Sequence, residues 1–156
     1  YGREFEGAAP GFTVYYLSSR AGFSSPTWRG FPATRINEAT YPAAAWLLTH
    51  GLWFDSDLRQ DPDGDGVNLL TAYALNLDPR LNLRGRLPGP VLGVDTLSLN
   101  FHASSPGITY RVETSTNLTH WTTTGVTQTA PGADGRSTAS VLRDAPQRFL
   151  RLLVQD

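Results

Sequence analysis

The segment that decides the fold is Asp61-Pro62-Asp63-Gly64-Asp65-Gly66, in which three carboxylates alternate with other residues and a glycine closes the run. Oxygen ligands at positions one, three and five, with glycine at position six, are how a short loop wraps a hard cation such as Ca²⁺. Three like charges so close together repel one another unless something neutralises them, and a divalent cation does so best. The sequence therefore predicts a calcium loop; without an ion, the same residues form a solvated acidic turn.

Helical segments are predicted on both sides of this loop. Upstream, Pro42 suits the first turn of a helix, which the Ala- and Leu-rich residues 43–48 then continue. Downstream, residues 69–75 are predicted to form a second helix, with Asn76 as its left-handed cap. Together with the loop, these helices make residues 37–80 a helical calcium-loop unit.

The hydrophobic period changes to two beyond residues 81–90, a stretch rich in Leu, Arg, Pro and Gly that is predicted to be a linker. After residue 90, apolar and polar side chains alternate as they do in half-buried strands. The predicted strands cover residues 96–101, 109–114, 121–129, 137–142 and 148–154. Strands at such short spacing imply a small antiparallel β-sandwich over residues 91–156. The expected fold class is therefore mainly β with a small α unit.

Residues 1–36 are rich in aromatic side chains but show no helical period. We predict one strand at residues 11–18 and an extended arm elsewhere, because the later aromatic residues stand among Gly, Ser and Pro. So much apolar surface needs a partner, which is either the rest of the chain or a neighbouring subunit that accepts the arm as an added strand. The residues expected to dock are Phe12, Val14, Tyr15, Tyr16, Leu17, Phe23, Trp28 and Phe31.

Composition narrows the classes of function. The net charge of −1 gives no electrostatic reason to expect nucleic-acid binding, and no apolar run reaches the roughly 18 residues of a membrane helix. The absence of Cys removes disulfides and thiol chemistry. The sequence contains neither a Gly-x-Ser-x-Gly elbow nor a His-Glu-x-x-His helix, and its three histidines are scattered. We therefore expect a protein that is not an enzyme.

The acidic loop, the helix after it and the later strands resemble a known type of module. Asp61 to Gly66 followed by Leu69-Leu70 and Leu77-Asp78-Pro79 is similar to the calcium loops of dockerin and thrombospondin type 3 proteins. Tyr110-Arg111-Val112-Glu113-Thr114-Ser115 resembles the small β domain that follows such a loop in secreted proteins of Verrucomicrobia and Planctomycetes. The resemblance covers about residues 40–156, and residues 1–36 lie outside it.

This resemblance implies an extracellular, calcium-stabilised C-terminal module that is not catalytic. Its ligands would be the side chains of Asp61, Asp63 and Asp65 and the backbone carbonyl of Val67. The sequence departs from the family pattern at Leu69 and Ala72, where an Asn and a carboxylate are usual, so the expected site is not ideal. The further candidate ligands are Asn68, one place before the usual Asn, and Asp57, upstream of the loop. Asp55, also upstream, and Asp78, beyond the second helix, are alternatives to Asp57.

The sequence favours one function and leaves a second open as the alternative. In the first, the chain is a self-assembling subunit of an extracellular filament or surface layer, connected by residues 1–36 to a second copy. In the second, it is a C-terminal binding or anchoring module of a larger secreted protein, with a possible cell-surface or polysaccharide contact through Trp121 or Tyr110. Asn117 begins an Asn-x-Thr sequence and is a candidate glycosylation site.

Overall fold

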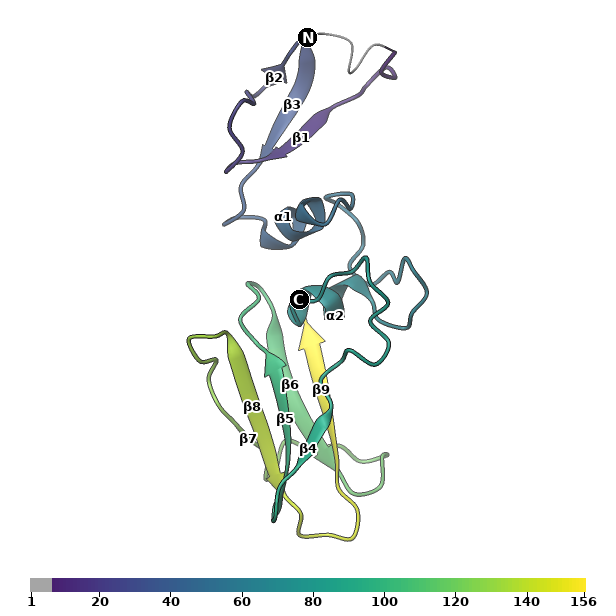
Figure 1. Cartoon of the computed structure of the whole chain (residues 1–156), viewed down its shortest axis with the longest axis vertical. Helices are drawn as coiled ribbons and strands as arrows, with labels where there is room; N and C mark the ends of the chain where they lie inside the picture. The colour runs from purple at the N-terminus through teal and green to yellow at the C-terminus, as the bar shows by residue number, and fades with distance from the viewer. Residues whose placement is uncertain (1–6) are drawn as a thin grey trace. The chain divides into compact units, whose positions relative to one another are not determined.

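The computed structural model describes residues 7–156 and is mainly β, which confirms the predicted fold class at this level (Figure 1). The chain divides at Ser56–Asp57 into two compact units, which we call unit 1 and unit 2. This boundary lies inside the segment 37–80 that was predicted to be one helical unit. Neither of the helices in the described part of the chain is long and apolar enough to cross a membrane.

Unit 1 contains a small sheet followed by one helix. Its strands lie in the order β1-β3-β2, with β1 parallel and β2 antiparallel to β3. The elements are β1 (Val14–Leu17), β2 (Thr27–Trp28), β3 (Phe31–Ile36) and α1 (Pro42–Thr49). The segment predicted to be an extended arm is thus paired with itself over residues 14–36, and within it only the strand at residues 11–18 was predicted.

A two-residue turn accounts for the pairing of β2 with β3. Trp28 lies opposite Phe31, so Arg29 and Gly30 form the loop, and both have positive φ, 47° and 84°. Two such residues make the turn whose twist matches that of the flanking strands. The guanidinium of Arg29 lies 4.6 Å from the centroid of the Trp28 ring, a cation–π contact that covers this end of the hairpin.

The aromatic residues of unit 1 contact one another. Tyr16 stacks on Phe23 at 5.0 Å between ring centroids, and Phe23 lies 4.7 Å from Trp28. Phe12 meets Phe31 edge to face at 5.6 Å. The remaining members of the predicted docking set lie in β1, where Val14, Tyr15 and Leu17 pair with β3. Much of the apolar surface of this segment is therefore covered within unit 1.

A carboxylate holds the chain where it leaves β1. Glu38 accepts a hydrogen bond from the hydroxyl of Ser18 and a second, 2.9 Å long, from the backbone N–H of Ser19. These bonds stabilise the charged form and lower the pKa of Glu38 to about 2, the Ser18 hydroxyl contributing most. They connect the end of β1 to the segment that follows β3, alongside the parallel pairing of the two strands.

Unit 2 contains helix α2 (Leu69–Ala74) and two antiparallel sheets (Figure 1). One sheet has the order β4-β5-β8-β7 and the other pairs β6 with β9. The strands are β4 (Pro90–Leu92), β5 (Thr96–His102), β6 (Thr109–Ser115), β7 (Thr127–Gln128), β8 (Arg136–Leu142) and β9 (Phe149–Gln155). The predicted strands at residues 96–101, 109–114, 137–142 and 148–154 are confirmed. The predicted strand at residues 121–129 is wrong over most of its length, because only Thr127–Gln128 is a strand there.

Both sheets of unit 2 contribute to one hydrophobic core. Alternate residues of β5 point inward, as period-two patterning predicts. Phe101 is 0% exposed and packs with Leu99, Val112 of β6 and Ala139 of β8. Leu75, directly after α2, belongs to the same cluster. The end of this helix is therefore part of the core.

Candidate metal centre

Three carboxylates converge in the acidic loop, residues 61–66. Each of Asp61, Asp63 and Asp65 offers a carboxylate oxygen, and these oxygens all lie within 4.8 Å of one another. The cluster could hold a metal ion, because hard cations take oxygen ligands at short distances from several carboxylates. The predicted clustering of the three side chains is thus present in the structure.

Backbone N–H groups already compensate part of the negative charge. Asp61 accepts hydrogen bonds from the N–H groups of Gly64 at 3.0 Å, Asp65 at 3.3 Å and Gly66 at 2.8 Å. The bond from Gly66 contributes most to lowering the pKa of Asp61 below its usual value. Sequence reasoning expected repulsion that a divalent cation would relieve best, and it did not anticipate these backbone hydrogen-bond donors. Each carboxylate oxygen has two lone pairs, so capacity for an ion remains.

Asp65 is the buried member of the cluster, at 5% exposed. One of its oxygens accepts a hydrogen bond from the N–H of Val67 at 2.8 Å, and the other accepts one from the N–H of Leu83. Leu83 lies in the segment 81–90 that was predicted to be a linker, and it is itself only 3% exposed. Asp65 thus joins the acidic loop to a chain segment 18 residues away.

The base of the loop is closed by backbone hydrogen bonds. The N–H of Leu69 donates to the carbonyl of Gln60 at 2.9 Å, and the N–H of Leu70 donates to that of Leu58 at 2.7 Å. These are first-turn N–H groups of α2, which have no partner inside the helix. Leu69 and Ala72, the two departures from the family pattern, are 2% and 1% exposed. Both apolar side chains are therefore part of the buried interior of unit 2.

The other predicted ligands have different contacts. Asn68 is the N-cap of α2, and its side-chain oxygen accepts a hydrogen bond from the N–H of Thr71 at 2.9 Å. Asp57 accepts one from the N–H of Arg59 at 2.9 Å. Asp57 does not belong to the cluster of converging carboxylates. The role of Asn68 as a cap was missed although Asn is a common N-cap residue. Val67 is buried beside the loop, where its N–H binds Asp65.

The helix that follows the loop is fixed to the sheets at its last turn. The Ser105 hydroxyl donates to the carbonyl of Tyr73 at 2.8 Å, and the Tyr110 hydroxyl donates to that of Ala74 at 2.7 Å. In return, the Tyr73 hydroxyl donates to the carbonyl of Pro106 at 2.8 Å. Helix ends leave carbonyls without internal partners, and here side chains of the β5–β6 turn and β6 bind them. The helix that follows the acidic loop is therefore held in place against the sheets by these hydrogen bonds.

The two aromatic residues considered for sugar stacking have other contacts. Tyr110 packs against the core and binds α2 through its hydroxyl. The guanidinium of Arg151 lies 4.3 Å from the centroid of the Trp121 ring, and its N–H groups bind the Glu113 carboxylate at 2.9 and 2.6 Å. Arg151 thus covers one face of Trp121, and this face is not free to stack on a sugar.

Two further polar groups lie in turns of unit 2. The Asn117 oxygen accepts hydrogen bonds from the N–H groups of Thr119 at 3.0 Å and His120 at 2.9 Å, so it shapes its own turn. The Ser104 hydroxyl lies 3.1 Å from Nε2 of His102, a contact that sequence reasoning missed. Burial, followed by the charge of Arg136, lowers the pKa of His102. Within residues 7–156, no hydrogen bond or ion pair joins a carboxylate to His102 to complete a triad.

Comparison of the whole chain with family models, with curated proteins and with solved structures finds no match.

Proposed function

We propose that the chain is a non-catalytic, calcium-stabilised module of an extracellular or cell-surface protein, in which unit 2 is a small β-sandwich built on the acidic loop. The observation that carries the proposal is the convergence of Asp61, Asp63 and Asp65 within 4.8 Å. The side-chain chemistry of this cluster fits Ca²⁺, which prefers carboxylate and carbonyl oxygens. Millimolar extracellular calcium suits such a non-ideal site, which lacks the usual carboxylate at position twelve of the loop.

The surroundings of the loop support a structural role for the ion. Asp65 is bonded to Leu83, and the loop leads directly into α2, whose last turn is bonded to Ser105 and Tyr110. An ion held by the loop would therefore stabilise the connection between α2 and the two sheets. The module is placed ahead of self-assembly because the aromatic residues of unit 1 already contact one another within the chain.

Adding calcium to the full chain is expected to raise the melting temperature of unit 2. A ligand that binds only the folded state at about one hundred times its Kd stabilises that state by about 2.7 kcal/mol. For a unit of this size, each kcal/mol raises the melting temperature by about 4–8 °C, so such a gain raises it by about 11–22 °C. Thermal unfolding followed by circular dichroism, with calcium and then with excess chelator, measures the difference.

Asp95→Asn is the matched control for this experiment, because it removes a carboxylate of unit 2 that lies outside the acidic cluster. This variant should keep the full response to calcium. Identical melting curves of the unaltered chain with calcium and with chelator would remove the ion from the proposal. An equal gain from magnesium would contradict calcium as the specific ion.

Self-assembly remains a second candidate because one observation favours it. An apolar cavity of about 220 Å³ lies between the two sheets of unit 2 at edge strands β4 and β9, and its walls include Leu99, Leu152 and Leu87. Edge strands present unpaired backbone groups that can accept an added strand from another chain. A second copy would bring such a strand to this open side of the unit.

Sedimentation velocity of the full chain with calcium tests this second candidate. Assembly predicts larger species as the protein concentration rises, and Leu87→Glu should shift them towards the monomer, because Leu87 is 43% exposed at the cavity wall. Leu118→Glu is the control, at an exposed position that does not line the cavity. A chain that stays monomeric at every concentration contradicts self-assembly and leaves the calcium module unaffected.

A further inference from the structure

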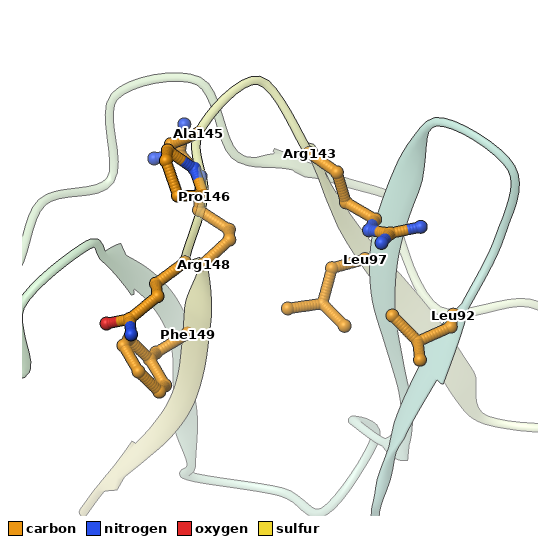
Figure 2. Close-up of a pocket in the computed structure, with 8 residues that line it drawn as sticks. Leu92, Leu97, Arg143, Ala145, Pro146, Arg148 and Phe149 are labelled. Atoms are coloured by element: carbon orange, nitrogen blue, oxygen red, sulfur yellow. The ribbon is translucent and has the colours of Figure 1, made fainter.

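A second cavity, of about 400 Å³, opens in unit 2 between the start of β5 and the turn before β9 (Figure 2). Leu92 and Leu97 line it on one side, and the segment that includes Pro146 and Phe149 lines it on the other. A volume of this size lies within the range of sites for small organic molecules, about 300–1,000 Å³, which are mostly apolar with a few polar groups.

Two arginines also line this cavity, and they differ in their partners. Arg148 pairs with Asp144, and this hydrogen bond and charge hold the pKa of Asp144 below its usual value. Arg143 donates from one terminal nitrogen to the carbonyls of Gly93 at 3.2 Å and Val94 at 3.4 Å. None of the ion pairs among residues 7–156 gives Arg143 a carboxylate partner.

The geometry also leaves a donor of Arg148 without a partner. Its Nε is buried and has no hydrogen bond within the described part of the chain. The cost of a buried donor without an acceptor is of the order of a hydrogen bond. The cavity therefore combines apolar walls, an exposed guanidinium at Arg143 and a second guanidinium whose hydrogen-bonding capacity is only partly used.

We propose that this cavity binds a small apolar molecule that ends in a carboxylate, with the apolar part against Leu97 and Phe149 and the carboxylate on Arg143. A guanidinium presents paired N–H donors that match the two oxygens of a carboxylate, and such charge-assisted bonds are stronger than neutral ones. The backbone carbonyls of Gly93 and Val94 hold the Arg143 side chain, so binding loses less side-chain entropy. This site is separate from the acidic loop and does not depend on calcium.

Titration of the full chain with phenylacetate, followed by nitrogen–proton correlation NMR, tests the proposal. The expected result is saturable shifts at Leu97, Arg143 and Phe149, and binding about tenfold weaker for the neutral analogue phenylacetamide. Arg143→Gln should weaken phenylacetate binding by about the same factor, and Arg143→Lys by less. Arg84→Gln is the matched control, an exposed arginine outside the cavity, and should leave binding unchanged.

Ala145→Trp provides a test that does not remove a charge, because it adds bulk to the cavity wall from a turn outside the strands. It should abolish the shifts at Leu97 while the rest of the spectrum stays as in the unaltered chain. Equal binding of phenylacetate and its amide would overturn the role of Arg143. Absence of saturable shifts at cavity residues would overturn the site itself, and neither result bears on calcium binding.

Discussion

Phe101→Ala is expected to destabilise unit 2 by about 3–5 kcal/mol, which is the usual cost of truncating a fully buried Phe. The Phe101 ring is 0% exposed and lies among residues of both sheets, including Leu99, Val112 and Ala139. Its removal takes away apolar contacts and leaves a cavity that neighbouring strands fill only in part. A typical domain is stable by only about 5–15 kcal/mol, so this loss is a large fraction of the total.

Urea unfolding of the full chain, followed by NMR signals assigned to unit 2, measures this loss. Signals from unit 1 provide an internal reference because its residues lie in a separate compact unit. Leu142→Ala is the matched control in the adjacent strand β8, where the side chain is 59% exposed, and it should change the stability by less than about 0.5 kcal/mol. Equal effects of the two variants would mean that the sheets do not share a core at Phe101.

The strands of unit 2 could be predicted because their sequences alternate over a sufficient length. In β5, the buried residues Leu97, Leu99 and Phe101 are separated by single polar residues, a pattern that only a strand with one buried face satisfies. The same reasoning wrongly predicted a strand over residues 121–129, because Thr is common both in strands and in turns. There, Thr122 bonds Thr124 and Gly125 has a φ of 81°, so the chain turns.

The sheet of unit 1 could not be predicted from periodicity. In β3 only Ala33 and Ile36 are buried, which is a spacing of three, and Pro32 lowers the strand propensity further. Its partner β1 is parallel and separated from it by the residues of β2, so no hairpin turn indicates the pairing. With the strands paired in this way, aromatic residues whose partner the sequence left open contact one another.

In the acidic loop, too, one part of the structure could be predicted from the sequence and another part could not. Local spacing was enough to bring Asp61, Asp63 and Asp65 together, because alternate residues of a tight turn can face the same point. The contact between Asp65 and Leu83 depends on a chain segment without a periodic pattern, and no local signal indicates it. Sequence reasoning therefore treated the three carboxylates as equivalent ligands, whereas the structure separates a buried Asp65 from an exposed Asp63.

Asp65→Asn and Asp63→Asn are therefore expected to differ in the absence of calcium. Asp65→Asn should destabilise unit 2 by about 2–3 kcal/mol, because an amide cannot accept from both the Val67 and the Leu83 N–H groups. The smaller desolvation cost of a neutral side chain offsets part of this loss. Asp63 makes one long bond of 3.4 Å to the N–H of Asp65, so its replacement should cost less than about 0.5 kcal/mol.

Calcium titration then separates the structural role of Asp65 from ligation. If the acidic loop binds calcium, Asp63→Asn should weaken the binding by about tenfold while the chelated protein keeps its stability, because a ligand charge is lost from an exposed position. Asp65→Asn should lower both the calcium affinity and the stability of the chelated protein. Isothermal calorimetry and urea unfolding in chelator measure them on the same samples. Equal and small losses of stability for the two variants would contradict the role of Asp65 in holding Leu83, because a buried N–H without an acceptor cannot be cost-free.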